Sequence, residues 1–201
     1  MSLEYNAFFS NQTWTLCRRP SHQNVARNKW VFKIKQKLNG TVDRFKARLV
    51  AKGFDKLSGI DYYETFSPIV KPATIHLVIA LAVQFDWSIK QLDVSNAFLH
   101  GILNEEVYMG QPPGFVHPLY LGHVYKLIKS LHGLKQAPRA WFTHLSQALL
   151  NIGFSGSQVD PSLFTCHDGP IHIFLLVSVD DIILIGNHSA TLTIFINKFA
   201  G

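Results

Sequence analysis

Residues 175–186 read Leu-Leu-Val-Ser-Val-Asp-Asp-Ile-Ile-Leu-Ile-Gly, and they place two adjacent aspartates, Asp180 and Asp181, inside the most apolar stretch of the chain. Aliphatic and β-branched residues on both sides favour two short strands joined by a tight turn. The wider apolar run, 171–186, is shorter than the roughly 20 residues that a membrane-spanning helix needs, and two charges lie within it. The pattern predicts a β-hairpin with carboxylates at its tip.

Two ionised carboxylates in apolar surroundings repel each other and lose hydration unless a positive charge compensates. A divalent cation does so, and Mg²⁺ prefers a few carboxylates together with waters and substrate phosphates. The simpler alternative is a solvated turn, where Asp is favoured in any case. A third isolated aspartate, Asp93, ends another apolar strand between Leu92 and Val94. This third carboxylate favours a shared metal site.

Three such carboxylates suit two-metal chemistry with Mg²⁺ or Mn²⁺. Two ions about 3.5–4 Å apart can activate one oxygen and stabilise another during in-line displacement at phosphorus. In this interpretation Asp93 and Asp180 bridge both ions, and Asp181 supports the first ion directly or from outside its coordination sphere. One ion activates the attacking hydroxyl, and the other holds a triphosphate and the leaving pyrophosphate.

Positive charge is concentrated near the N-terminus. The 201-residue chain has a net charge of +6, and 12 of its 19 Lys and Arg residues lie between Arg18 and Lys56, opposed there only by Asp43 and Asp55. This distribution predicts a polyanionic partner, with a solvated basic face as an equal alternative. The two cysteines have no metal-ligand or disulfide spacing, and no signal peptide is visible, so we expect an intracellular, cytoplasmic protein.

Residues 30–52 have the period-two pattern of a β-hairpin, and Asn39-Gly40 predicts a type I′ turn between its strands. Apolar and basic residues alternate along the return strand. One face carries Phe45, Ala47, Leu49 and Ala51, and the other carries Arg44, Lys46, Arg48 and Lys52. Such a basic row can lie against phosphates. The alternative is an ordinary edge hairpin whose lysines deter aggregation.

The rest of the chain mixes helices and strands without a strict βαβ rhythm, so we expect an α+β fold. Helical spacing of apolar residues predicts helices near 74–83, with Thr74 as N-cap, and near 138–152. Further strands are expected near 87–94 and 124–128. Residues 1–28 are expected to be irregular.

Six stretches, in this order, resemble the copia-type reverse transcriptase family of LTR retrotransposons. They are Lys46-Ala47-Arg48-Leu49-Val50-Ala51-Lys52-Gly53-Phe54, Tyr63-Glu64-Thr65-Phe66-Ser67-Pro68, Gln91-Leu92-Asp93-Val94, Asn96-Ala97-Phe98-Leu99-His100-Gly101, Gly133-Leu134-Lys135-Gln136-Ala137-Pro138-Arg139 and Val179-Asp180-Asp181-Ile182-Ile183-Leu184. The resemblance implies a fragment of a Pol polyprotein with a right-hand polymerase fold, truncated so that the thumb is absent. It places the reverse transcriptase domain at 29–201, with fingers at about 29–72 and 110–140 and a partial palm at about 73–109 and 141–201.

The resemblance also implies an activity and its partners. The activity is RNA- or DNA-templated DNA synthesis from deoxynucleoside triphosphates on a DNA primer, with two Mg²⁺ or Mn²⁺ ions at Asp93, Asp180 and Asp181. In the family this takes place in a virus-like particle, and thumb, ribonuclease H and integrase regions accompany the domain. No membrane is implied.

Further site residues follow from the same resemblance. Lys46 and Arg48 match positions that contact the incoming triphosphate, and the guanidinium fork of Arg48 suits phosphate oxygens. Phe98 matches the ring that excludes a ribose 2′-hydroxyl, the group that separates the two sugars. A solvated strand charge and a core phenylalanine are the alternatives. The positions expected to contact template or primer are Ser178, His132, Gln136 and Arg139.

The sequence departs from the family at three positions. Ser178 and His132 stand where Tyr is usual, and His76 stands where Arg is frequent. These departures leave open an inactive remnant that retains basic nucleic-acid binding. A third hypothesis, an Asp-dependent nuclease, fits the ordered motifs less well.

Overall fold

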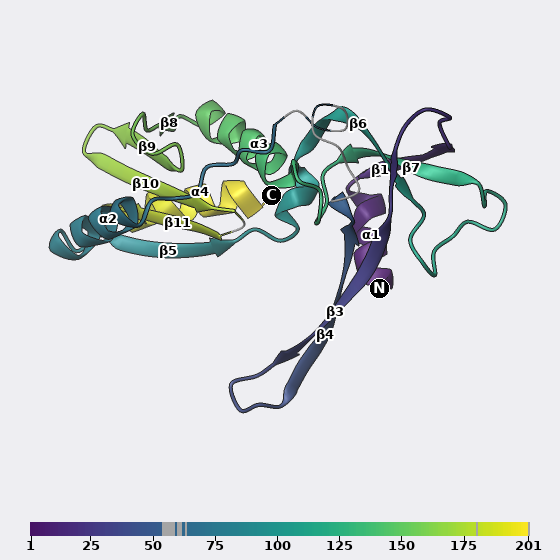
Figure 1. The fold of residues 1–201 in the computed structure, drawn as a ribbon. Helices are drawn as coiled ribbons and strands as arrows, with labels where there is room; N and C mark the ends of the chain where they lie inside the picture. The colour runs from purple at the N-terminus through teal and green to yellow at the C-terminus, as the bar shows by residue number, and fades with distance from the viewer. Residues whose placement is uncertain (54–58, 60–61, 63, 180, 201) are drawn as a thin grey trace. The chain divides into compact units, whose positions relative to one another are not determined.

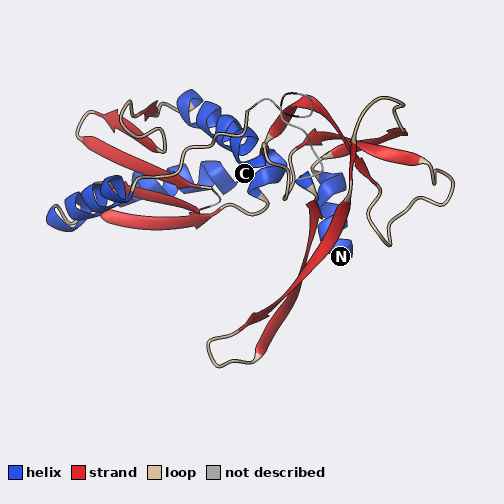
Figure 2. Ribbon diagram, in the orientation of Figure 1, coloured by secondary structure: helices blue, strands red, loops and turns tan. Residues whose placement is uncertain are grey.

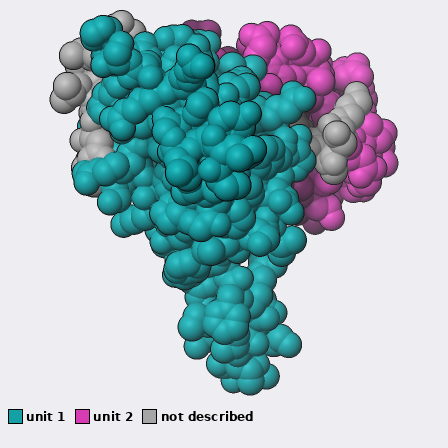
Figure 3. All heavy atoms as spheres, turned by 90° about the vertical axis from the view of Figure 1, so that its right-hand side faces the viewer, with its two compact units in different colours: residues 1–66, 98–141 teal, residues 67–97, 142–201 magenta. Residues whose placement is uncertain are grey.

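The computed structural model describes residues 1–53, 59, 62, 64–179 and 181–200, the last three by their backbone alone. Helices and strands are mixed along the chain, as the sequence predicts (Figures 1 and 2). The chain divides into two compact units, coloured separately in Figure 3. Unit 1 comprises Met1–Phe66 and Phe98–Trp141, and unit 2 comprises Ser67–Ala97 and Phe142–Gly201.

Unit 1 contains a four-stranded sheet in the order β1-β7-β6-β2. Its strands are β1 (Trp14–Arg18), β7 (His123–Lys129), β6 (Ile102–Gly110) and β2 (Val25–Ala26). Only the β2–β6 pair is parallel among the pairs of this sheet that the structure describes. The buried core residues of this unit include Val107, Met109, Leu127 and Leu131.

The N-terminal segment is structured, so the prediction that residues 1–28 are irregular is wrong. Helix α1 spans Ser2–Ser10, and β1 and β2 follow it. Phe8 is buried in the core of unit 1, and the Tyr5 hydroxyl shares a 2.8 Å hydrogen bond with that of Tyr125. Trp14 stacks on Tyr125 with ring centroids 4.6 Å apart. Burial of aromatic side chains orders this segment. These residues follow no clear period in the sequence, so the pattern did not predict a helix.

A basic two-stranded hairpin also belongs to unit 1. Strand β3 (Asn28–Gln36) pairs with β4 (Val42–Ala51), which confirms the predicted strands. The turn is not the expected type I′ turn, because only Gly40 has positive φ, at 81°, while Gly40 N–H donates to the Lys37 carbonyl. This arrangement is a type I turn followed by a left-handed glycine.

Two backbone hydrogen bonds tie the end of β4 to a glycine turn. Ala51 N–H donates to the His132 carbonyl at 2.8 Å, and Gly53 N–H donates to the Gly133 carbonyl at 3.1 Å. A Cβ on Gly133 would lie 2.0 Å from the Ala51 oxygen, and one on Gly53 would lie 2.1 Å from the Gly133 oxygen. Two motifs far apart in the sequence therefore meet through backbone that tolerates no side chain.

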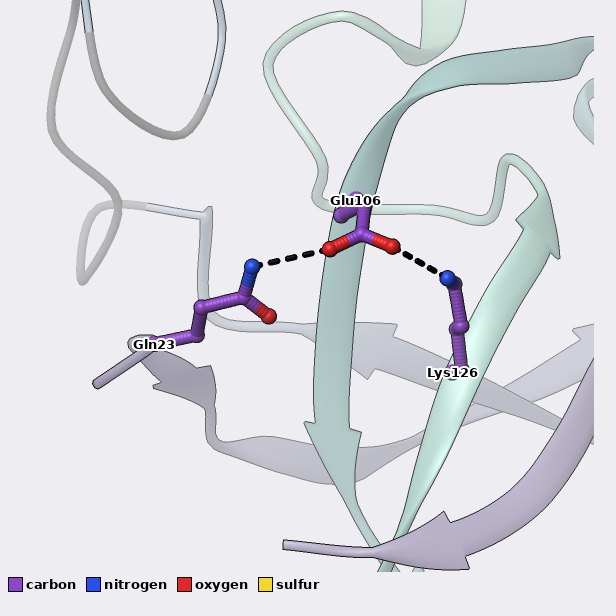
Figure 4. Close-up of polar contacts among 3 residues, drawn as sticks. All are labelled: Gln23, Glu106 and Lys126. Carbon is purple, nitrogen blue, oxygen red and sulfur yellow. Dashed lines mark hydrogen bonds and ion pairs between the residues drawn. The ribbon is translucent and has the colours of Figure 1, made fainter. Parts of the chain in front are cut away.

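A polar bridge holds the segment before β2 against the sheet (Figure 4). Gln23 Nε2 donates to Glu106 at 2.9 Å, and Lys126 forms an ion pair with the other carboxylate oxygen of Glu106. Donation by Gln23 and then by Lys126 lowers the pKa of the Glu106 carboxyl. The three side chains join the β2 region, β6 and β7.

Unit 2 contains a five-stranded sheet in the order β5-β11-β10-β9-β8. Its strands are β5 (Ser88–Asp93), β11 (Asp181–Gly186), β10 (Ile171–Ser178), β9 (Leu163–Asp168) and β8 (Ser155–Gly156). Every strand pair in this list is antiparallel. The helices of the unit are α2 (Pro72–Gln84), α4 (Ser189–Ala200) and the part of α3 (Ala137–Asn151) after Trp141.

Helix α2 packs on one face of this sheet. Val78 and Ala82 of α2 lie in one cluster with Leu176 and Ile185. Because side chains alternate along a strand, Leu175 and Leu184 point to the opposite face. Both are also fully buried. Burial on both faces explains the continuous apolar runs that the sequence shows.

The start of α2 is held by a distant carboxylate. The helix begins at Pro72 with Lys71 as N-cap, so the prediction of Thr74 as N-cap is wrong. The Thr74 hydroxyl donates to Asp160 Oδ2 at 2.6 Å, and Lys71 N–H donates to the same oxygen at 3.1 Å. Ser162 N–H donates to Asp160 Oδ1 at 3.0 Å.

None of the helices described is long and apolar enough to cross a membrane.

Candidate active site

Two of the three predicted metal ligands lie side by side on adjacent strands of the sheet of unit 2. Asp93 is the last residue of β5, Asp181 is the first residue of β11, and the two are direct partners in the antiparallel register. Both residues are exposed. Directly opposed residues have Cβ atoms about 4.5–5.5 Å apart, and like charges in such a pair are destabilising. The pair is therefore a position where a cation would relieve repulsion.

The third predicted ligand, Asp180, lies outside the described residues. Within the described part of the chain, no group of three or more His, Cys, Asp and Glu side chains gathers around a possible metal position. The structure thus places two carboxylates together, and the predicted trio stays a prediction.

The turn between β10 and β11 has an unusual backbone. Ser178 pairs with Asp181, so the hairpin turns through two residues. Val179 has φ of 56°. A β-branched residue is uncommon at positive φ because its Cβ crowds the backbone, and such strain is often found at functional sites. The apolar strands predicted on both sides of the aspartates are confirmed by β10 and β11.

The carboxylate of Asp181 borders a cavity of about 240 Å³ on the face that α2 covers. Its lining combines apolar side chains with three polar ones. Gln91 Nε2 donates to Asp181 Oδ1 at 3.4 Å. The residues lining this cavity are Val70, Ile75, Gln91, Leu176, Ser178, Asp181 and Ile183. Ser178, predicted to contact the primer, therefore shares a cavity with Asp181.

Sequence reasoning missed the role of Gln91, although a signal was present. Gln91 lies two residues before Asp93 on the same strand. Because side chains two apart on a strand share a face, its amide had to lie on the same side as the Asp93 carboxylate. The register then brings it beside Asp181.

Lys46 and Arg48 lie half-buried on β4 of unit 1. Lys46 is paired directly with Lys33, and Lys35 with Arg44, which places like charges opposite each other along the hairpin. Burial raises the pKa of the Glu4 carboxyl on α1, while the nearby charges of Lys46 and Arg48 act in the opposite direction. A row of mutually repelling cations is stabilised by an anionic partner.

Phe98 and His132 contact each other within unit 1. Their rings meet edge to face with centroids 4.8 Å apart, and Phe98 also packs against the core of the unit. The position of His132 is fixed by the Ala51 hydrogen bond described above. Two residues that the resemblance singles out in different parts of the sequence are therefore neighbours.

Gln136 and Arg139 have different surroundings. Gln136 is only 3% exposed, and its Oε1 has no hydrogen-bond partner among the described residues. Arg139 forms an ion pair with Glu64 at 3.0 Å and approaches Glu105 at 4.0 Å. Their predicted contacts with template and primer stay predictions. Glu64 and Glu105 were not foreseen as partners.

Comparison with known proteins assigns the chain to a family. The model of a family described as "Reverse transcriptase (RNA-dependent DNA polymerase)" matches residues 11–200. The chain belongs to the reverse transcriptase family. This reverse transcriptase chain is 48% identical over 188 residues to the retrovirus-related Pol polyprotein from transposon RE1 of Arabidopsis thaliana. The aligned region covers 93% of the chain and 13% of the relative.

Other relatives carry the same description. The reverse transcriptase chain is 47% identical to the Pol polyprotein from transposon RE2 of Arabidopsis thaliana, over 96% of the chain and 13% of the relative. It is 41% identical to that from transposon TNT 1-94 of Nicotiana tabacum, over 92% of the chain and 14% of the relative. The resemblance to copia-type retrotransposon reverse transcriptases is thus confirmed, and the chain spans about one-seventh of the length of these relatives.

Proposed function

We propose that this reverse transcriptase chain contributes the catalytic carboxylates and a phosphate-binding hairpin for templated DNA synthesis. The observation that carries the proposal is the register pairing of Asp93 with Asp181. Oxygen donors of this kind suit Mg²⁺ or Mn²⁺. In this proposal Asp93, Asp180 and Asp181 hold two such ions, which supply charge stabilisation and an activated 3′-hydroxyl when bound.

The chain's own residues orient the substrates. Gln91 donates to Asp181 and so fixes the direction of that carboxylate. Lys46 and Arg48 bind phosphate oxygens of the incoming deoxynucleoside triphosphate, Arg48 by its planar fork. Phe98, whose ring His132 meets edge to face, is proposed to exclude a ribose 2′-hydroxyl. Ser178, Gln136 and Arg139 support the primer and an RNA or DNA template.

We assign unit 1 to the fingers and unit 2 to the palm of a right-hand polymerase. The basic hairpin of unit 1 and the acidic strand ends of unit 2 support the assignment. In this proposal the fingers and palm follow the two units, which divide after Phe66, Ala97 and Trp141. A thumb and ribonuclease H and integrase regions are proposed partners, and an intracellular site of action is expected.

Extension of a DNA primer on an RNA template tests the proposal. The 201-residue chain is assayed with Mg²⁺ and with Mn²⁺ beside Asp93→Asn and Asp181→Asn variants. We expect extension to fall in both. Asp168→Asn is the matched control, because Asp168 is an exposed aspartate at the end of β9 in the same sheet. Extension that is equal in all four proteins would refute the assignment of the carboxylates.

Binding without synthesis is the second candidate, favoured by the facing cations of the hairpin. Here RNA affinity falls with salt while no primer is extended. A Lys46→Ala variant should lower the slope of log K against log salt by about 0.7–0.9 if Lys46 contacts one phosphate. Lys126→Ala is the control, because Lys126 is already paired with Glu106. An unchanged slope in Lys46→Ala would exclude Lys46 as a phosphate contact.

A further inference from the structure

We propose that His167 and His172 form a chelating site for a nitrogen-preferring transition-metal ion, with Cu²⁺ the best fit. The two residues are direct partners on β9 and β10. Their Nδ1 atoms lie 2.8 Å apart at the surface of unit 2. Neutral imidazole nitrogens are common ligands of Cu²⁺, Ni²⁺ and Zn²⁺. The proposal is independent of the polymerase assignment.

The separation of the two nitrogens selects a coordination geometry. With metal–nitrogen bonds of about 2.0–2.1 Å, a 2.8 Å separation subtends roughly 90° at the ion. Neighbouring positions of a tetragonal site make this angle, whereas tetrahedral zinc needs a wider one. Cu²⁺ also stands highest in the general affinity order of divalent first-row ions. Chelation requires both rings to turn about χ2 so that their lone pairs converge, a soft motion for histidine.

The surroundings restrain both histidine residues. His172 stacks on Trp87 with centroids 6.2 Å apart and planes 16° apart. His167 meets Phe174 edge to face at 6.3 Å. The backbone of His172 is fixed as well, because its N–H donates to Asn187 Oδ1 at 2.9 Å and its carbonyl accepts from Asn187 N–H at 3.3 Å. The strand positions of the two residues are therefore set before an ion binds, and only the ring torsions have to adjust.

The histidine pair is separate from the carboxylate pair in place and in chemistry. The histidine pair and the carboxylate pair lie on the sheet face that α2 covers. His172 is an even number of residues from Ser178 on β10, and Ser178 is the partner of Asp181. Six residues of strand separate them, a distance of about 20 Å. Oxygen-preferring Mg²⁺ has low affinity for imidazole, so the two sites should fill independently. The alternative is a histidine pair that merely shares one proton.

Trp87 provides an internal reporter for the test, because Cu²⁺ bound beside an indole quenches its fluorescence. The untagged chain is titrated with Cu²⁺ in the presence of excess Mg²⁺. We expect saturable quenching at one equivalent, reversed by EDTA and lost in Trp87→Phe. Since the second imidazole binds intramolecularly, His167→Asn or His172→Asn should weaken Cu²⁺ binding roughly 100-fold.

The control is His188→Asn, which removes an exposed histidine at the start of α4 and retains an N-capping side chain. It should bind Cu²⁺ as the parent chain does. Electron paramagnetic resonance should show two nitrogen ligands in the parent and one in either histidine variant, and far-ultraviolet circular dichroism confirms folding. Equal quenching in parent and His167→Asn, or a spectrum without two nitrogen ligands, would overturn the proposal.

Discussion

Asp93 and Asp181 close the β5–β11 ladder as direct partners, so two carboxylates end neighbouring strands at the same edge of the sheet. This arrangement is unfavourable without a cation and favourable with one. Stability and metal binding should therefore respond in opposite directions to the loss of either charge.

Asp93→Asn and Asp181→Asn should each raise the free energy of unfolding in EDTA by about 0.2–1 kcal/mol, because they remove like-charge repulsion. Each should lower the stabilisation that Mg²⁺ adds and reduce primer extension by roughly 100-fold or more. Urea unfolding with and without Mg²⁺ measures the first effect. A variant that is less stable than the parent in EDTA would contradict the repulsion argument.

Val179→Gly should leave the free energy of unfolding equal to that of the parent or raise it by up to about 1 kcal/mol. Relief of a left-handed conformation, worth about 1–2 kcal/mol, outweighs the entropy that glycine adds to the unfolded chain. Val159→Gly is the matched control, because Val159 is exposed and has ordinary φ. The control should lose roughly 0.5–1 kcal/mol. Equal losses in both variants, measured by urea unfolding, would show that Val179 carries no strain.

Asp160→Asn should destabilise the chain by about 1.5–3 kcal/mol, because it weakens charge-assisted hydrogen bonds to a buried carboxylate. Burial raises the pKa of Asp160, but donation by Thr74, Lys71 and Ser162 outweighs it, so the pKa is lowered overall. The stabilisation is therefore complete above the ordinary Asp pKa of about 3.9 and is lost as pH falls through the lowered value.

Thermal unfolding between pH 7 and pH 2 checks this linkage. The parent chain should lose stability toward acid more steeply than Asp160→Asn. Asp168→Asn, which changes an exposed aspartate, should follow the parent. If the stability of the parent and of Asp160→Asn falls equally with pH, Asp160 is not a source of acid sensitivity.

Gly133→Ala should lower the free energy of unfolding by more than about 2 kcal/mol. The new Cβ would clash with the Ala51 oxygen, and the φ of 91° at Gly133 is unfavourable for alanine. Gly122→Ala has open space and should change the free energy of unfolding by less than about 0.5 kcal/mol. Guanidinium denaturation of both variants gives the comparison. A small effect at Gly133 would mean that the contact between the two motifs yields easily.

Local patterns in the sequence predicted the elements that carry strong periodicity. The β3–β4 hairpin, the β10–β11 hairpin and α3 were expected from alternation, apolar runs and helical spacing, and all three are present. Helix α1 was missed because its aromatic residues have no clear helical stripe and are held by tertiary contacts. The Asn39-Gly40 signal identified the turn but not its type.

The features that the sequence did not predict depend on contacts between residues far apart in the chain. The hydroxyl of Thr74 looked free to cap α2, but Asp160, distant in the chain, accepts its hydrogen bond. The proximity of Asp93 and Asp181 was inferred from the chemistry of carboxylates, and only strand pairing supplies the register. The partners of Arg139 likewise depend on packing between separate segments.

The division of the chain into units has a consequence for synthesis on the ribosome. Each unit is assembled from two stretches separated by a stretch of the other. Unit 1 is incomplete until Trp141 emerges, and by then Ser67–Ala97 of unit 2 has already been made. Domains usually fold one after another during translation. Here the first part of the second unit is made before the first unit can close, and it stays without its partner strands until β10 and β11 are synthesised.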